Sequence, residues 1–285
     1  MSPHSASRHG LPAVAPDPLP IEVVDNHVHL DIGRDGAEPL GVAEAVARAR
    51  AVGVNRLVQV GCDLDSIDFT IDAVERFPEV LGAIALHPNE VPKLAAAGTL
   101  SAAYDLVERA AGHERVRAVG ETGLDYYRTG PEGVAVQQDS FRWHIDLAKR
   151  LGKALQIHDR DAHVDVLRVL GEEGAPDRTV LHCFSGDLTM ARECVERGYY
   201  LSFAGTVTFK NARALRDALT VTPLSQVLVE TDAPYLTPSP HRGATNATFL
   251  VPHTIRAMAG VLNVDVPALC RAVSENSERV YGSWS

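Results

Sequence analysis

Two histidines separated by one residue follow an apolar, β-branched run near the start of the chain. His27 and His29 stand in the segment VVDNHVHLD, residues 23–31. Side chains two residues apart in a β-strand point to the same face of the sheet. The two imidazoles are therefore expected to converge on one point. That arrangement suits a bound metal ion, and it equally suits two hydrogen-bonded turn residues.

Further residues of metal-ligand type recur along the chain, each after a short apolar run. They are His87 in ALHPNE, Glu121 in VGETGLDYY, His158 in LQIHDRD, His182 in VLHCFSG and Asp232 in VETDAPYL. A turn or a helix cap would explain any one of them alone. Their relation to one another depends on the elements that carry them.

The chain alternates short apolar runs with longer amphipathic ones. The predicted strands span residues 21–28, 55–61, 81–87, 116–122, 153–158, 179–184, 199–205 and 226–232. The predicted helices span residues 39–53, 65–78, 137–152, 162–174, 188–198, 211–223 and 266–282. This alternation implies parallel pairing through right-handed crossovers and predicts an α/β fold, a (β/α)8 TIM barrel. An open doubly wound sheet is the alternative, although no G-x-G-x-x-G follows the first strand.

Length and composition fit one domain. The chain has 285 residues, of which 45% are hydrophobic and 22% charged. There is no apolar run of membrane-spanning length and no secretory-type start, so we expect a cytoplasmic protein without membrane contacts. Residues 1–20 are rich in proline and are interpreted as a flexible tail, and residues 21–285 as one barrel domain.

Cysteine usage and charge narrow the functional classes. Free, buried thiols in a reducing compartment are expected at Cys62, Cys183, Cys194 and Cys270, because none forms a C-x-x-C pair. Cys183 follows His182 directly and should therefore pack in the core. The net charge of −10 argues against a broad basic face for duplex nucleic acid. It does not argue against phosphate chemistry in a metal-bearing pocket.

In a barrel of this kind the chemistry lies at the C-terminal ends of the strands. The histidines and carboxylates after the predicted strands would therefore meet at one mouth. Such a cluster would be costly without a cation to satisfy it. Imidazoles and carboxylates together suit Zn, Mn, Fe or Ni, whereas Mg prefers oxygen ligands.

The motifs taken together resemble the TatD family of metal-dependent hydrolases. DNHVHLD resembles the opening D-x-H-x-H motif, and VGETGLDYY resembles the central Glu motif. LQIHDRDAH, VLHCFSG, LSFAGTVTFKNA and LVETDAPYL match later blocks in order, and SENSERVYG resembles the closing helix. The resemblance covers Val24 to Gly282.

This resemblance implies a TIM-like barrel, two divalent ions and metal-dependent deoxyribonuclease activity. By motif position, His27, His29 and Asp232 would hold one ion. His158 and His182 would hold the other, and Glu121 would bridge the pair. Asp232 is the expected general base, because it could reach both a metal ion and the attacking water. The metal (Mg, Mn or Zn) is left open, although the family is usually described with Mg.

Candidate substrate contacts follow from residue type and position. By the resemblance, His87 is expected to lie behind the ligands or to bind phosphate. Lys210 and Asn246 are the favoured candidate phosphate donors, with Arg128, Arg160 and Arg242 less favoured. Two departures bear on specificity. Asn89 stands where the family often has a second histidine, and residues 245–248 read Thr-Asn-Ala-Thr in place of Arg-Asn-Glu-Pro.

The expected activity is an exonuclease acting on single-stranded DNA ends, with RNA as a further candidate substrate, and the resemblance implies 3′→5′ polarity. In such a site two ions activate a water that attacks phosphorus. Phe209, Tyr126, Tyr127 and Tyr235 could stack on unpaired bases.

Two alternatives remain: an amide or ester hydrolase or aminoacyl-tRNA deacylase on the same barrel, and a non-enzymatic binding protein. Glu121 stands where many amidohydrolases have a carbamylated lysine, which favours the nuclease. A monomer is expected.

Overall fold

The computed structural model describes residues 13–34, 36 and 38–284. Eight parallel strands pair in sequence order from β1 to β8. They are β1 (Val23–Val28), β2 (Val54–Gly61), β3 (Val80–Ile84), β4 (Val116–Asp125), β5 (Ala154–Arg160), β6 (Thr179–Leu181), β7 (Tyr200–Phe203) and β8 (Val227–Val229). The predicted barrel is confirmed.

The seam between the first and last strands closes the barrel, which excludes the open doubly wound sheet. The backbone of Val28 pairs with that of Ala233, and the N–H of Asp232 donates to the carbonyl of His27 at 3.0 Å. Nearer the N-terminal end of β1, a side chain makes the hydrogen bonds that link the first and last strands. The carboxylate of Asp25 accepts from the N–H of Thr231 at 2.8 Å and from its hydroxyl at 2.6 Å.

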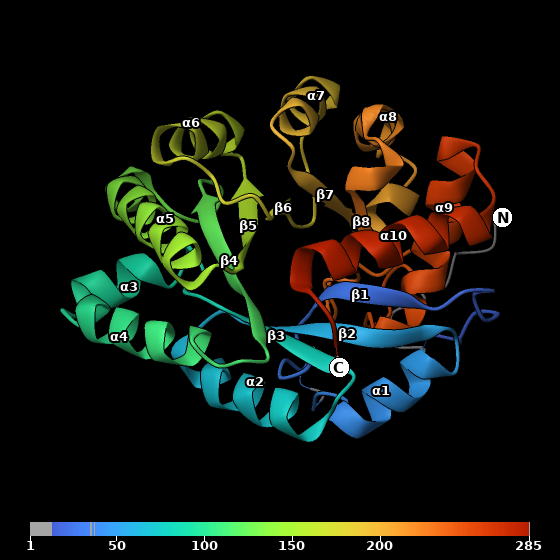
Figure 1. Ribbon diagram of the computed structural model, residues 1–285, viewed down its shortest axis with the longest axis horizontal. Helices are drawn as coiled ribbons and strands as arrows, with labels where there is room; N and C mark the ends of the chain where they lie inside the picture. The colour runs from blue at the N-terminus through green and yellow to red at the C-terminus, as the bar shows by residue number, and fades with distance from the viewer. Residues whose placement is uncertain (1–12, 35, 37, 285) are drawn as a thin grey trace, which may run out of the picture.

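Helices surround the strands (Figure 1). They are α1 (Val42–Arg50), α2 (Leu64–Arg76), α3 (Val91–Ala96), α4 (Leu100–Ala111), α5 (Pro131–Leu151), α6 (His163–Glu173), α7 (Leu188–Glu196), α8 (Arg213–Val221), α9 (Val251–Leu262) and α10 (Val266–Tyr281). Within the described residues there are also three short 3-10 helices: η1 (Gly205–Thr208), η2 (Leu224–Gln226) and η3 (Thr248–Leu250). In the described part of the chain, α3, α4 and α9 lie outside every predicted helix.

Local chemistry sets several helix boundaries. Asp63 caps α2, accepting from the N–H of Ser66, whose hydroxyl in turn accepts from the N–H of Asp63. Helix α5 begins six residues before the predicted start because Pro131 occupies its first turn, where a missing N–H costs nothing. It ends at Gly152, whose φ of 60° is the left-handed conformation that glycine adopts without strain.

The strands that carry the ligand-type residues differ in length from the predicted ones. Strands β6 and β8 end at Leu181 and Val229, so His182 and Asp232 stand just beyond them. Strand β4 continues to Asp125, which places Glu121 within the strand. The local pattern located the polar residues correctly but did not show where strand pairing stops.

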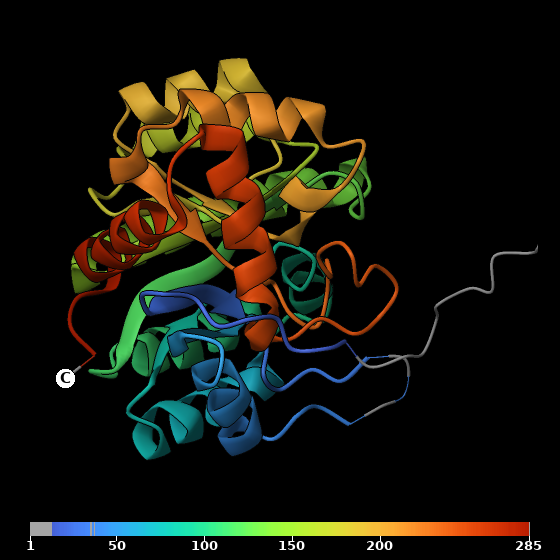
Figure 2. The ribbon, with the colours of Figure 1, turned by 90° about the vertical axis from the view of Figure 1, so that its right-hand side faces the viewer.

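Two cores hold the fold together. The larger one lies between the strands and the surrounding helices. The smaller one fills the barrel with residues such as Val58, Leu81 and Leu228, and it includes Tyr281 and Trp284 from the end of the chain. Helix α10 therefore closes the base of the barrel, and Figure 2 shows it at the opposite end from the loop that precedes α9.

The segment that precedes the barrel is described from residue 13 onward, so most of the predicted tail lies outside the described residues. Its last residues pack on the domain: Leu19 is buried and its N–H donates to the carbonyl of Val52 at 3.0 Å. Among the described residues no single helix is long and apolar enough to cross a membrane. Only residues 248–262 and 266–281, bent by 111° at their junction, meet that length and composition as a pair.

Candidate metal centre

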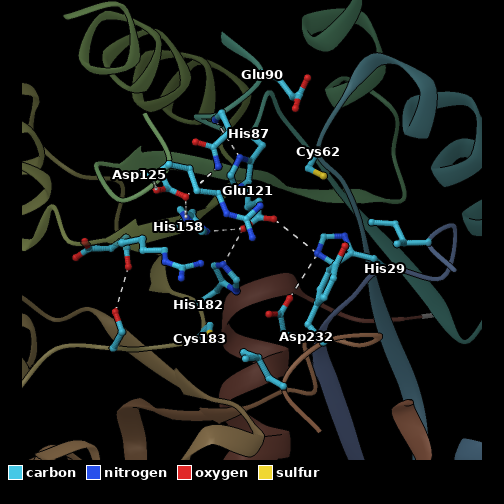
Figure 3. A pocket seen from close by; sticks show the side chains of 18 of the residues that line it. His29, Cys62, His87, Glu90, Glu121, Asp125, His158, His182, Cys183 and Asp232 are labelled. Atoms are coloured by element: carbon cyan, nitrogen blue, oxygen red, sulfur yellow. Dashed lines mark hydrogen bonds and ion pairs between the residues drawn. The ribbon is translucent and has the colours of Figure 1, made fainter. Parts of the chain in front are cut away.

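A cavity of about 660 Å³ opens at the C-terminal ends of the strands (Figure 3). Its lining includes the candidate ligands His29, Glu121, His158, His182 and Asp232. Six carboxylates line it, from Asp63, Glu90, Glu121, Asp125, Asp159 and Asp232, against two guanidinium groups, from Arg128 and Arg160. Carboxylates in this number make the pocket suited to cations.

Strand β1 brings its two histidines together, as their spacing predicts. The Nε2 atoms of His27 and His29 lie 3.3 Å apart. The pairing register between β1 and β2 shifts between Asp25 and Val28. This irregularity interrupts the alternation of the strand, so that Val24 packs in the barrel interior and His27 also faces inward.

Glu121 joins two groups of imidazoles. Its Oε1 lies 3.6 Å from Nε2 of His29 and 3.9 Å from Nε2 of His27. Its Oε2 lies 2.7 Å from Nε2 of His182 and 3.2 Å from Nδ1 of His158. Asp232 completes the first group, with Oδ1 at 3.5 Å from His29 and 3.8 Å from His27. Each oxygen of Glu121 thus faces a different set of nitrogens.

The second nitrogen of each of these histidines is held by a hydrogen-bond acceptor. Nδ1 of His29 contacts the carbonyl of Val60 at 3.0 Å, and Nδ1 of His27 contacts Oε1 of Gln156 at 3.1 Å. Carboxylates hold the other two histidines. Glu230 lies 3.2 Å from Nδ1 of His182, and Asp125 lies 3.2 Å from Nε2 of His158. Such outer partners fix the tautomer and orientation of metal-binding histidines.

The protonation of the cluster follows from burial and from the two carboxylates. Burial keeps the pKa of His27 well below its usual range. For His29 burial acts in the same direction, but Asp232 and Glu121 outweigh it and raise the pKa to about 9. Glu121 and Glu230 likewise raise the pKa of His182 against burial. A cation that binds here would displace these protons, because ligating imidazoles must be neutral.

The donor set fits divalent cations. Ligand atoms of His27, His29 and Asp232 lie within 4.8 Å of one another, as do those of Glu121, His158 and His182. Two groups of nitrogen and oxygen donors, bridged by one carboxylate, match the preferences of Zn or Mn more closely than an all-oxygen Mg site.

Glycine allows the two strands beneath this cluster to approach closely. A Cβ on Gly123, which has a φ of 133°, would lie 2.1 Å from the carbonyl oxygen of His158. Glycine two residues after Glu121 therefore lets β4 and β5 pair at the point where both carry ligands.

Five of the six predicted substrate residues fall into two groups. His87, Arg128 and Arg160 line the cavity. Lys210 and Arg242 are exposed outside its lining, and the guanidinium of Arg242 lies 3.6 Å above the ring of Phe209. Lys210 and Arg242 could therefore contact only the phosphates of a substrate that extends beyond the cavity.

Asn246 is a correction to the predicted substrate contacts. Its side chain is buried, and Nδ2 donates to the carbonyls of Thr231 at 2.9 Å and Tyr235 at 2.5 Å. Because both amide hydrogens are used on the backbone, this residue holds the loop after β8 in shape and offers no donor to substrate.

The cysteines also differ from expectation. Cys194 and Cys270 are buried free thiols, but Cys62 and Cys183 are only partly buried and line the cavity. Cys183 has a φ of 42°, so the strand alternation that predicted core packing no longer holds there. The sulfur of Cys62 lies within 4.8 Å of ligand atoms of His29 and Glu121.

Several residues that support the ligands were not predicted, although the sequence held a signal for them. Glu230 stands two residues before Asp232, and Gln156 stands two residues before His158. Side chains at this spacing share a strand face. A polar side chain two positions before a candidate ligand is therefore a signal for a residue that lies below the site and hydrogen-bonds to the ligand histidines. Asp125, which contacts His158, lies four residues after Glu121 in the same sequence motif.

A (β/α)8 barrel with histidine and carboxylate ligands at its mouth defines the class of metal-dependent barrel hydrolases. Residues 24–282 match the family model described as TatD related DNase, and the chain belongs to the TatD family. It is a metal-dependent hydrolase of that family.

Its relatives carry names of the same class. The metal-dependent hydrolase TatD of Mycobacterium tuberculosis is 48% identical, over 91% of this chain and 98% of that protein. The metal-dependent hydrolase YcfH of Escherichia coli K12 is 39% identical, over 91% and 95%. Among solved structures, the TatD homologue YjjV of Escherichia coli K12 superposes with a TM-score of 0.83 at 24% identity, covering 92% of this chain and 98% of its own.

Proposed function

We propose that the protein is a phosphodiesterase that uses two divalent ions to remove nucleotides from the 3′ end of single-stranded DNA. The observation that carries this proposal is the arrangement of Glu121, whose two oxygens face two separate sets of imidazole nitrogens. Divalent ions held by these residues would supply Lewis acidity to a phosphoryl group and would lower the pKa of the attacking water.

Asp232 is the proposed general base. Its Oδ1 faces the first group of histidines, and its carboxylate lines the cavity beside them. A base must lie within hydrogen-bond reach of the proton that it removes. From this position Asp232 takes the proton of the attacking water as the water oxygen bonds to phosphorus. The bond from phosphorus to the 3′ oxygen of the preceding nucleotide breaks, and that oxygen takes a proton from solvent.

His87 supplies a phosphate contact. The backbone N–H of Asn89 donates to Nδ1 of His87 at 3.0 Å. A backbone N–H can only donate, so Nδ1 carries no hydrogen and the ring hydrogen resides on Nε2. His87 therefore offers the cavity an N–H donor, which suits a phosphoryl oxygen rather than a metal ion.

The rim of the cavity suits an unpaired chain end. The guanidinium of Arg160 lies 4.2 Å above the ring of Tyr127, which is 65% exposed, and Tyr235 is 42% exposed on the lining. Exposed aromatic faces beside cationic groups bind unpaired bases, with about 1–3 kcal/mol per stacked base. These features support a single-stranded nucleic acid over a small amide or ester.

The test is cleavage of a 5′-labelled single-stranded DNA by the purified protein with Mg, with Mn, with Zn and with a chelator. We expect a metal-dependent ladder that shortens from the 3′ end, and no product from a closed single-stranded circle. Cleavage of the circle would replace the exonuclease by an endonuclease. Protein that retains metal but cleaves neither substrate would overturn the proposal in favour of a carbonyl hydrolase, to be sought with ester, amide and aminoacyl-tRNA substrates.

A further inference from the structure

One buried amide lies directly beneath the metal-binding residues. Gln156 is on β5, is fully buried, and contacts three groups from distant parts of the chain. Its Nε2 donates to the backbone carbonyl of Asn26 at 3.0 Å and to the hydroxyl oxygen of Tyr281 at 2.6 Å. Its Oε1 lies 3.1 Å from Nδ1 of His27.

The backbone partner decides which end of the amide faces which group. A carbonyl oxygen such as that of Asn26 can only accept a hydrogen bond, so the NH₂ end of Gln156 must face it. The oxygen end then faces His27, and a contact at 3.1 Å between them requires a hydrogen on Nδ1. The ring nitrogen left without a hydrogen is Nε2, which faces Glu121 and Asp232.

The ring of His27 is also fixed in orientation. It is fully buried and stacks on the ring of His182, with centroids 3.9 Å apart and planes 13° from parallel. The outer partners of His158 and His182 are carboxylates, whereas His27 has a neutral amide. An amide fixes the tautomer without adding negative charge to the barrel interior, which already contains Glu230.

Neighbouring residues make room for this amide and connect it to the last helix. A Cβ on Gly120 would lie 2.4 Å from Cβ of Gln156, so glycine is required directly before Glu121. In α10, Tyr281 contacts Gln156, and the hydroxyl of Ser277 donates to Oδ1 of Asn26 at 2.8 Å. The helix that closes the base of the barrel therefore supports the strand that carries His27.

We propose that Gln156 is a positioning residue that holds His27 in its Nδ1–H tautomer and presents the Nε2 lone pair to the metal ion. Asn26 and Tyr281 hold the amide in the orientation this requires. The inference concerns metal binding by His27, and it holds whatever substrate the enzyme cleaves.

The first measurement is the tautomer of His27 in the wild-type, full-length protein. Long-range ¹H–¹⁵N correlation spectra of metal-free protein labelled at histidine distinguish the two neutral forms, and a His27→Gln sample identifies the signal. We expect the Nδ1–H form. The Nε2–H form would overturn the proposal without reference to any variant of Gln156.

The second measurement is the affinity for Mn and Zn by calorimetry. Gln156→Met keeps the volume of the side chain but cannot accept from His27, and it should weaken one of the two binding steps by about tenfold to a hundredfold. Asn276→Leu is the matched control, because Asn276 is also fully buried and its partners are not candidate metal ligands. It donates to the backbone carbonyls of Leu224 and Val227 and accepts from Nη1 of Arg279.

The control separates a positioning role from a structural one. Both variants should lower the melting temperature, and only Gln156→Met should change metal affinity. Tyr281→Phe should have a smaller effect on affinity than Gln156→Met, because the carbonyl of Asn26 still orients the amide. Equal affinity in Gln156→Met and wild type would overturn the proposal. Intact ion binding with no DNA cleavage would instead refute the nuclease and leave this inference standing.

Discussion

Oε2 of Glu121 lies 2.7 Å from Nε2 of His182, and the same carboxylate turns its other oxygen toward the histidines of β1. One side chain from the middle of β4 therefore contacts ligands from β1, from β5 and from the segment after β6. The two groups of candidate ligands therefore share this single carboxylate.

Replacing Glu121 by glutamine should impair both groups of candidate ligands together. The variant keeps the size of the side chain but loses the charge and one acceptor oxygen, so the affinity for both ions should fall by more than about tenfold. Metal content after equilibrium dialysis measures this directly. Glu90→Gln is the control, since Glu90 lines the cavity but is paired with Lys93 at 2.7 Å. Loss of one ion with full retention of the other would contradict a bridging role.

Asp232→Asn should retain the fold and most of the metal but lose turnover. Asp232 has a φ of 54°, a left-handed conformation that asparagine tolerates far better than alanine. If the carboxylate is the general base, kcat should fall by about 10²–10⁴. Steady-state kinetics on a labelled oligonucleotide, together with metal analysis, provide the measurement. A variant with wild-type kcat would rule out the assigned role.

His87→Asn should weaken substrate binding without releasing metal. An asparagine side chain can still accept from the N–H two residues on, in place of Nδ1, but its amide does not reach as far as Nε2. Loss of a hydrogen bond to a charged group costs about 1.5–3 kcal/mol, which corresponds to a rise in KM of roughly tenfold to a hundredfold. A drop in metal content would show instead that His87 supports the ligands.

The buried His144 should make stability depend on pH. Its Nε2 accepts from the N–H of Leu86 at 3.1 Å, and its Nδ1 donates to the carbonyl of Ser140 at 2.8 Å. Burial lowers the pKa of this histidine to about 4 from 6.5. Between pH 4 and 6.5, His144 therefore binds a proton in the unfolded chain but not in the folded protein. Stability is therefore full above pH 6.5 and falls as the pH drops toward 4, by about 3 kcal/mol.

Urea unfolding of metal-free protein at several pH values tests this expectation. The variant His144→Gln retains a donor and an acceptor but has no group that titrates in the interval. It should therefore show a shallower decline in the free energy of unfolding between pH 6.5 and 4 than wild type shows. Parallel curves for the two proteins would mean that other groups cause the decline.

Much of the centre could be predicted from local sequence because each main ligand is attached to a strand of recognisable pattern. His27 and His29 converge as their two-residue spacing requires. His158, His182 and Asp232 follow apolar runs and meet at one mouth, since parallel strands of a barrel end together.

Other features depended on partners distant in the sequence. Glu121 reads as a strand-end residue, yet β4 continues past it because β5 pairs with β4 as far as Arg160. Asn246 reads as a phosphate donor, but the backbone of Thr231 and Tyr235 takes both of its amide hydrogens. Helices α3, α4 and α9 were not predicted, although α4 has an amphipathic pattern that buries Ala103, Val107 and Ala111 at four-residue spacing.

The sequence by itself determined the class of fold and the chemical types of the ligands, because strand periodicity and the order of polar residues are local properties. Only the tertiary structure decided how those ligands are held. The tautomer of His27 depends on an amide 129 residues away, and that amide is oriented by the carbonyl of Asn26 and by a tyrosine a further 125 residues along the chain. Such contacts exist only after the barrel has closed, since closure alone brings β1, β5 and the last helix into one interior.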